Sequence, residues 1–328
     1  MVEQLPPSHL KSKRQIKIWK QQQNDNTAKR QKADSYTSQD PFRYSERNFK
    51  SRIIPTDIMA QVVDTSQLLD SNFSPSLQQQ HGIRHVTLAT DLRFERPDIF
   101  GLVDESWKRR SLDAFVITQI PGLIIIPNPF TPKAQRRLIQ LCLTDYTLPP
   151  NTSNLDAHYD RPKKGIWDLY QREYEGLLTA EDKEYYVPSK ANDKQLGNNN
   201  LYGNNGDDTA TNRTPLLPPS DLLRKQRWIT LGYQYDWKTK LYDLENGLPM
   251  PEELNDLAKA VVSAAEGIGY SNDEHSSSES TTSWKNTYRG STFKAEAGVI
   301  NYYQLRDTLM AHVDKSEVNM EAPIVSVR

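Results

Sequence analysis

Apolar side chains recur at helical spacing in two stretches of the chain. The first stretch begins at Pro132, which suits the first position of a helix, directly after Thr131, a residue type that caps helices. The apolar stripe of this helix is predicted to consist of Ala134, Leu138, Ile139, Leu141 and Cys142. A second helix is predicted over residues 251–266, before Gly267. Such an apolar face normally packs on a sheet.

Apolar runs and alternating positions predict several strands. A short apolar run at residues 123–126 is one, and the sequence GVINYYQ at 298–304 is another. Extended segments are also predicted for LMAHVDK at 309–315 and for residues 323–327. From Arg227, the sequence RWITLGYQYDW predicts a strand with one face formed by Ile229, Leu231, Tyr233, Tyr235 and Trp237. Two interpretations of this face stay open: a sheet face buried in a core, or a wall on which a flat base stacks.

Three polar segments interrupt these patterns. Residues 1–40 carry a basic run, residues 191–214 are rich in Asn, Gly and Asp, and residues 271–284 are rich in Ser and acidic side chains. Such compositions bury too little apolar surface to fold alone, so a disordered tail and two insertions are predicted. The basic tail is interpreted as a solvated segment, a nucleic-acid-binding or nuclear-import signal, or an organelle-targeting segment.

Composition narrows the class of protein. The formal net charge of the 328 residues is −1, so nucleic-acid binding would depend on local basic patches. The single cysteine, Cys142, excludes an internal disulfide and is typical of a reducing compartment. Its place in the apolar stripe predicts a buried structural thiol. No apolar run approaches the roughly 20 residues of a membrane span, and the first residues lack a secretory signal. A soluble intracellular protein with no membrane partner is expected.

Candidate chemistry concentrates in the sequence LMAHVDKSE at 309–317. A strand would place His312 and Asp314 on one face, where an imidazole and a carboxylate can bind the same cation. With a further histidine, they would complete the triad of two histidines and one carboxylate. That triad binds Fe(II) and leaves three positions for a cosubstrate and O₂. The motif alone is weak, because a surface histidine beside a surface aspartate has the same spacing.

Several separated motifs strengthen the metal interpretation. The sequence NYY is followed by HVD, with His312 eleven residues after Asn301, and then by SE and APIVSV. Upstream, PGLIIIPNPFTP, SNLDAHY, RWITLGYQYDW and FKAEAGVINYYQL occur in the same order. Together they resemble the AlkB family of Fe(II)- and 2-oxoglutarate-dependent dioxygenases, in its homologue 1 branch, over roughly residues 41–328.

The resemblance implies an α+β fold with a double-stranded β-helix, or jelly-roll, core and supporting helices. By motif position, His312 and Asp314 would be iron ligands, and Asn301 and Tyr303 would hold 2-oxoglutarate. The substrate lid would contain Tyr233, Tyr235 and Trp237. The implied cofactors are Fe(II), 2-oxoglutarate and O₂, and the implied partner is nucleic acid, either tRNA or DNA with N-methylated bases. The predicted organisation is a tail at 1–40, an N-terminal extension at 41–110 and the dioxygenase domain at 111–328.

The sequence departs from the family pattern near its end. The family carries a third ligand, a histidine several dozen residues after HxD, and a further arginine that binds 2-oxoglutarate. No histidine follows His312, and the sequence ends at Arg328. An incomplete domain with missing C-terminal strands and weak iron binding is therefore expected. Three functions stay open: demethylation of N-methylated bases, a non-catalytic truncated isoform that binds nucleic acid or a protein, and a histone or peptide demethylase or hydroxylase. The expected compartment is the nucleus, cytoplasm or mitochondrion.

Overall fold

In the computed structural model, most of the chain from residue 41 onward is described. The predicted tail at 1–40 and the predicted insertion at 191–214 lie outside the described residues, as does most of the insertion at 271–284. The described residues are 41–49, 53–60, 62–70, 73, 75–103, 113–159, 161–179, 217–236, 239, 241–271, 283–305, 307–309, 312–314 and 317–328.

The chain divides into two compact units. The smaller unit consists of Met1–Val63 and Arg306–Asp314, and the larger unit consists of Asp64–Leu305 and Lys315–Arg328. The described helices of the smaller unit are α2 (Pro41–Phe49) and α3 (Thr56–Met59). The predicted tail, extension and dioxygenase domain, with a boundary at residue 110, stay a prediction.

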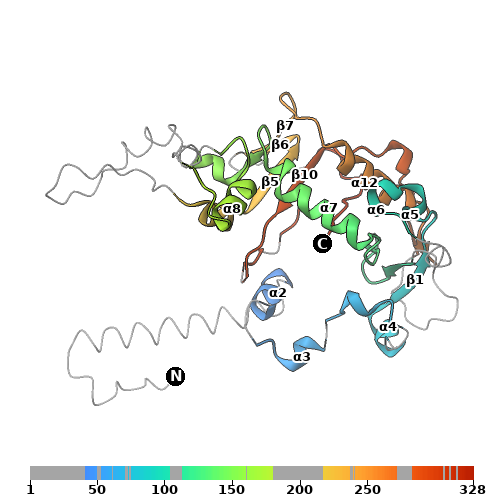
Figure 1. The fold of residues 1–328 in the computed structure, drawn as a ribbon. Coiled ribbons are helices and arrows are strands. Elements are labelled where there is room, and N and C mark those ends of the chain that lie inside the picture. The colour runs from blue at the N-terminus through green and yellow to red at the C-terminus, as the bar shows by residue number, and fades with distance from the viewer. Residues whose placement is uncertain are drawn as a thin grey trace, which may run out of the picture. The chain divides into compact units, whose positions relative to one another are not determined.

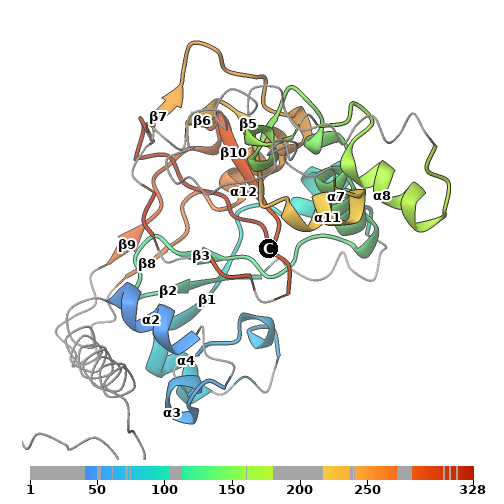
Figure 2. The ribbon, with the colours of Figure 1, turned by 90° about the vertical axis from the view of Figure 1, so that its left-hand side faces the viewer.

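The first sheet of the larger unit supports its main apolar core. The strands pair antiparallel and lie side by side in Figure 2, in the order β1 (Ile83–Thr87), β2 (Asp113–Ile117), β3 (Ile124–Ile125). Ala114 and Val116, two residues apart on β2, are both buried in this core. The helices that contribute to it are α5 (Leu92–Glu95), α6 (Pro97–Phe100) and α12 (Glu252–Ala264).

The second sheet has one face covered by helices. Its antiparallel strands follow the order β10 (Ala297–Asn301), β5 (Trp228–Gly232), β4 (Thr152–Ser153), and Figure 1 shows β5 beside β10. Ile229, Leu231 and Ile300 lie on the covered face, where they pack with residues of α7 (Pro132–Leu143) and α12. Because directly opposed residues share a face, Trp228, Thr230, Val299 and Asn301 lie on the other face.

The remaining elements are short. Helices α8 (Ile166–Tyr174) and α11 (Pro219–Lys225) pack together around Leu169 and Leu222. Two ribbons each have two antiparallel strands: β6 (Gln234–Asp236) with β7 (Leu241–Asp243), and β8 (Gly269–Tyr270) with β9 (Trp284–Lys285). The other described helices are η1 (Thr65–Gln67), α4 (Pro75–His81), η2 (Asp145–Thr147), η3 (Asn154–Ala157) and η5 (Gly290–Thr292).

Both predicted helices are confirmed. Thr131 caps α7, since its Oγ1 accepts a hydrogen bond from the Ala134 N–H at 3.4 Å, and Pro132 is the first helical residue. On α12, the predicted apolar face is buried at Leu257, Ala258 and Val262. The stripe of α7 is narrower than predicted, because Ile139 is 52% exposed. The predicted strand at 123–126 is confirmed as β3, which is shorter.

The longer strand predictions are wrong in part. The strand from Arg227 ends at Gly232, whose φ of +68° turns the chain, so Tyr233 and Tyr235 do not continue the face of Ile229 and Leu231. Trp237 lies outside the described residues. Neither 312–314 nor 323–327 forms a strand; Val325 instead packs as a single side chain on a core cluster beside α12. Alternation specifies which side chains share a face, but a strand also needs a partner, which local sequence does not encode.

Helices and sheets are therefore mixed, as an α+β prediction requires. The strands among the described residues form two three-stranded sheets and two two-stranded ribbons. No helix within the described ranges combines the length and the apolar character of a membrane span.

Candidate functional site

The predicted iron ligands lie side by side in the smaller unit. His312 Nε2 is 3.5 Å from Asp314 Oδ1, and the two side chains are 52% and 58% exposed. The prediction that both side chains turn to the same side is therefore confirmed, although the segment is not a strand. The pair is accessible to a small ion from solvent.

The spacing of this pair suits two neighbouring positions around one metal ion. Ligand atoms about 2.1 Å from an ion and at right angles to each other lie about 3.0 Å apart. The observed 3.5 Å requires only a small inward rotation of either side chain. An imidazole nitrogen and a carboxylate oxygen are also donors of the kind that Fe(II) accepts. Within the described ranges, no group of three His, Cys, Asp or Glu side chains is placed to hold a metal, so the pair supplies two ligands.

The predicted 2-oxoglutarate residues belong to the larger unit. Asn301 is the last residue of β10 and is exposed on the sheet face that α7 and α12 leave uncovered. Tyr303 follows two residues later and is 55% exposed. Both side chains are therefore available to a ligand.

Tyr302, between these two residues, anchors the segment. Its backbone N–H donates to the Arg227 carbonyl at 2.8 Å, and its hydroxyl donates to the Cys142 carbonyl on α7. Burial raises the pKa of the Tyr302 hydroxyl well above its ordinary range, so the group stays a neutral donor. Alternation along the chain indicated only that Tyr302 points away from Asn301. Its anchoring role was missed, because the acceptor lies 160 residues away in sequence.

The predicted lid residues are divided between a turn and a ribbon. Tyr233 follows Gly232 directly, and Tyr235 lies in the middle of β6. The rings of Tyr235 and Tyr242 meet edge to face across the ribbon, with centroids 5.1 Å apart. The Tyr242 hydroxyl donates to Glu317 Oε1 at 3.4 Å, which ties the ribbon to the C-terminal segment of the same unit. The structure thus places one predicted lid residue, Tyr235, within this ribbon and another, Tyr233, directly before it.

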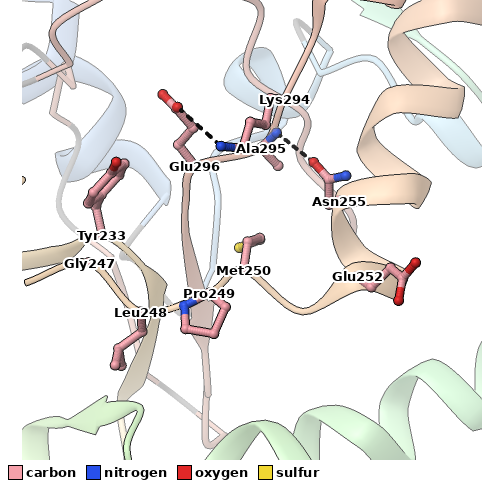
Figure 3. A pocket seen from close by; sticks show the side chains of 10 residues that line it. All are labelled: Tyr233, Gly247, Leu248, Pro249, Met250, Glu252, Asn255, Lys294, Ala295 and Glu296. Carbon is pink, nitrogen blue, oxygen red and sulfur yellow. Dashed lines mark hydrogen bonds and ion pairs between the residues drawn. The ribbon is translucent and has the colours of Figure 1, made fainter.

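A cavity of about 530 Å³ lies beside Tyr233 (Figure 3). Three chain segments line it: Tyr233 itself, the segment from Gly247 into α12, and residues 294–296. The Ala295 N–H donates to Asn255 Oδ1 at 2.9 Å, and Lys294 Nζ lies 3.9 Å from Glu296 Oε1. The sequence did not predict this cavity, because its lining residues come from three segments that are separated in sequence and do not form a recognisable motif.

Gly232 is expected to be the least replaceable residue at the base of the lid. A Cβ there would lie 2.1 Å from the Glu296 carbonyl oxygen, which is backbone and cannot rotate away. Gly232→Ala should therefore lower the free energy of unfolding by about 2 kcal/mol more than Gly176→Ala. Gly176 is the matched control, since its φ is also positive, at +71°, but nothing lies within 4 Å of its added Cβ. Urea denaturation measures both variants, and equal losses would show that the close approach to Glu296 is absent.

Cys142 should be nearly unreactive in the folded protein. Burial raises the pKa of its thiol from an ordinary 9.0 to about 11. At pH 8 the thiolate fraction, and with it the rate of alkylation by iodoacetamide, should be about 100-fold lower than in urea-unfolded chain. Because the folded-state pKa is raised, the associated stability is present below pH 9 and is lost as the pH rises toward 11. The structure places Cys142 at intermediate burial, less buried than predicted. Equal alkylation rates in native and unfolded protein would contradict even this partial burial.

Comparison with known proteins defines the class. Residues 190–328 match the family model described as the 2OG-Fe(II) oxygenase superfamily, and this range contains all the predicted site residues. This part of the chain is therefore similar to 2OG-Fe(II) oxygenase domains.

Individual relatives narrow this class to one family. The human protein named nucleic acid dioxygenase ALKBH1 is 32% identical over 213 residues, which are 65% of this chain and 40% of that protein. The Arabidopsis thaliana DNA N(6)-methyladenine demethylase ALKBH1A is 28% identical over 298 residues, covering 87% of this chain and 70% of that protein. The Schizosaccharomyces pombe tRNA demethylase abh1 is 28% identical over 215 residues, covering 65% and 55%. The chain is therefore similar to the ALKBH1 proteins of the AlkB family. It spans about two fifths of the length of the mammalian relatives it matches.

Proposed function

We propose that this protein is an Fe(II)- and 2-oxoglutarate-dependent dioxygenase that demethylates N-methylated bases in nucleic acid. The observation that carries the proposal is the His312–Asp314 pair, 3.5 Å apart, inside the segment that matches the oxygenase family model. The names of the relatives support nucleic acid as the substrate class, since they specify a nucleic acid dioxygenase, a DNA demethylase and a tRNA demethylase.

The proposed roles follow the chemistry of each side chain. His312 and Asp314 would hold the iron through an imidazole nitrogen and a carboxylate oxygen, which requires both side chains to be deprotonated at the ligating atom. Asn301 and Tyr303 would hold 2-oxoglutarate, because an amide and a phenol can donate hydrogen bonds to its carboxylates. When bound, iron, 2-oxoglutarate and O₂ supply one oxygen atom to the N-methyl carbon, with succinate and CO₂ as co-products. The hydroxymethyl group then leaves the base as formaldehyde.

Tyr233 and Tyr235 are proposed to contact the methylated base. Aromatic rings stack on bases with little dependence on their sequence, so these residues would contribute affinity, and the methyl group would select the substrate. Similarity to this family also supports a jelly-roll core. In this proposal the sheet β10-β5-β4 contributes to that core, with its uncovered face, which carries Asn301, toward the interior.

The test is turnover by the purified chain on three substrates of equal concentration. These are an N-methylated tRNA fragment, an N-methylated DNA oligonucleotide and a methylated histone peptide, each with Fe(II), 2-oxoglutarate and O₂. We expect formaldehyde and succinate in equal amounts from a nucleic acid substrate, and none without 2-oxoglutarate. Release from the peptide alone would replace nucleic acid with protein as the substrate. Tight binding of methylated nucleic acid with no turnover at saturating cofactors would overturn the enzymatic proposal in favour of a binding function.

A further inference from the structure

A polar cluster joins the second sheet to the first residue of the ribbon β6–β7. Gln234 Oε1 lies 2.6 Å from the hydroxyl of Thr152 on β4 and 2.6 Å from the hydroxyl of Thr230 on β5. The two hydroxyls also contact each other. On the same amide, Nε2 donates to the Gly232 carbonyl at 2.8 Å. One side chain thus contacts both strands and the turn that leads into the ribbon.

Burial makes these contacts obligatory. Thr230 is only 1% exposed, and a hydroxyl that is removed from water without a partner costs free energy. Three oxygen–oxygen contacts join the two threonine hydroxyls and Gln234 Oε1. The hydroxyls have only two protons to share among these contacts, so each proton finds an acceptor within the cluster. The amide of Gln234 accepts through its oxygen and donates through its nitrogen, and only this orientation satisfies both sets of partners.

The cluster lies where the chain leaves and re-enters the sheet. Gly232, with its positive φ, turns the chain out of β5, and Gln234 begins β6 one residue after Tyr233. After β7, the returning chain donates the Leu248 N–H to the same Gly232 carbonyl at 3.2 Å. The outgoing and returning chains are therefore both bound at one peptide group, whose carbonyl accepts from Gln234 Nε2 and from the Leu248 N–H.

We propose that Gln234, Thr152 and Thr230 form a clamp that sets the direction in which the ribbon β6–β7 projects from the sheet. The clamp would act through the position of Tyr233 and Tyr235, which flank Gln234 in the sequence. Gln234 is thus a positioning residue: it orders the lid before the substrate arrives and reduces the ordering that binding must supply. The effect on substrate binding rests on the proposed function, whereas the effect on the ribbon does not.

Amide hydrogen exchange tests the clamp without any substrate. Thr230→Val and Gln234→Met each remove hydrogen bonds of the clamp with little change in side-chain volume. Each variant should speed amide hydrogen exchange across β6 and β7 about threefold to tenfold. Exchange in β1 and β2 should not change. Thr230→Ser keeps the hydroxyl and should restore protection. Thr144→Val is the matched control, since its hydroxyl donates to the Gln140 carbonyl on α7 at 2.9 Å, outside the clamp. Unchanged exchange in the ribbon, or an equal increase throughout the larger unit, would overturn the clamp.

Kinetics then test the consequence for the substrate. In Thr230→Val and Gln234→Met, the KM for methylated oligonucleotide should rise about threefold to tenfold, while kcat and the KM for 2-oxoglutarate stay unchanged. Thr230→Ser should restore the oligonucleotide KM. Loss of kcat with unchanged KM would contradict a positioning role. If the wild-type chain shows no turnover, the proposed function fails. The hydrogen-exchange experiment then still tests whether the clamp orders the ribbon.

Discussion

His312→Ala and Asp314→Ala should each lower demethylation by more than about 100-fold. Loss of residues that only support metal ligands commonly costs 10- to 100-fold in metal affinity or activity, so loss of a ligand itself should exceed that range. Binding of nucleic acid should change by less than about twofold, because phosphate attraction depends on basic side chains and not on the metal. The measurements are formaldehyde release at saturating substrate and fluorescence anisotropy with a labelled methylated oligonucleotide.

The chain contains its own control for this prediction. His85 and Asp113, on the paired strands β1 and β2, form a second histidine–aspartate contact, with side chains 54% and 31% exposed. His85→Ala makes the same chemical change at a similarly exposed pair and should leave turnover within about twofold of wild type. If His85→Ala and His312→Ala reduce turnover equally in folded protein, the metal assignment is wrong. If either His312→Ala or Asp314→Ala also abolishes nucleic-acid binding, the separation between the metal and the phosphate contacts is wrong.

Asp156→Asn should lower the free energy of unfolding by about 2 kcal/mol. Asp156 pairs with Arg161 and also accepts the Ser153 N–H at 2.7 Å in a capping box on η3. The Arg161 side chain is only 7% exposed, whereas that of Asp156 is 36% exposed. Removing one partner of a fully buried ion pair commonly costs about 3–5 kcal/mol, because it leaves a charge in a poorly solvated place. A smaller loss is expected here, because the pair is only partly buried and the carbonyls of Thr147 and Asn151 still accept from the guanidinium. Urea denaturation followed by circular dichroism measures the loss.

Asp221→Asn is the matched control for this partly buried pair. Asp221 and Arg224 are joined at 3.4 Å on α11, but their side chains are 43% and 72% exposed. Exposed pairs contribute about 0–1 kcal/mol, so this variant should unfold within about 1 kcal/mol of wild type. A loss from Asp156→Asn no larger than that from Asp221→Asn would show that solvent reaches the Arg161 guanidinium. The Asp156 contact matters for the site because it holds the segment that enters β4 at Thr152, a member of the clamp.

The sequence predicted the helices correctly but not the lid. Thr131, Pro132 and the apolar repeat predicted α7 correctly, because a cap and a stripe depend on residues within one or two turns. The lid strand was predicted to continue through Gly232, because apolar and aromatic residues recur at every second position on both sides of the turn. The positive φ of Gly232 and the approach of the Glu296 carbonyl, 64 positions away in sequence, both require a glycine at this point, and neither is visible in the alternation.

The sequence alone determined the two helices, the spacing that turns His312 and Asp314 toward each other, and the order of motifs that indicated the AlkB family. All of these depend on residues close together in the chain or on motifs that can be matched in linear order. Tertiary structure decided which strands pair, where Tyr302 is anchored, and how Gln234 joins two strands to the ribbon. The Tyr302–Cys142 and Gln234–Thr152 contacts unite segments 160 and 82 positions apart in sequence, and their free energy arises only when the fold brings these segments together.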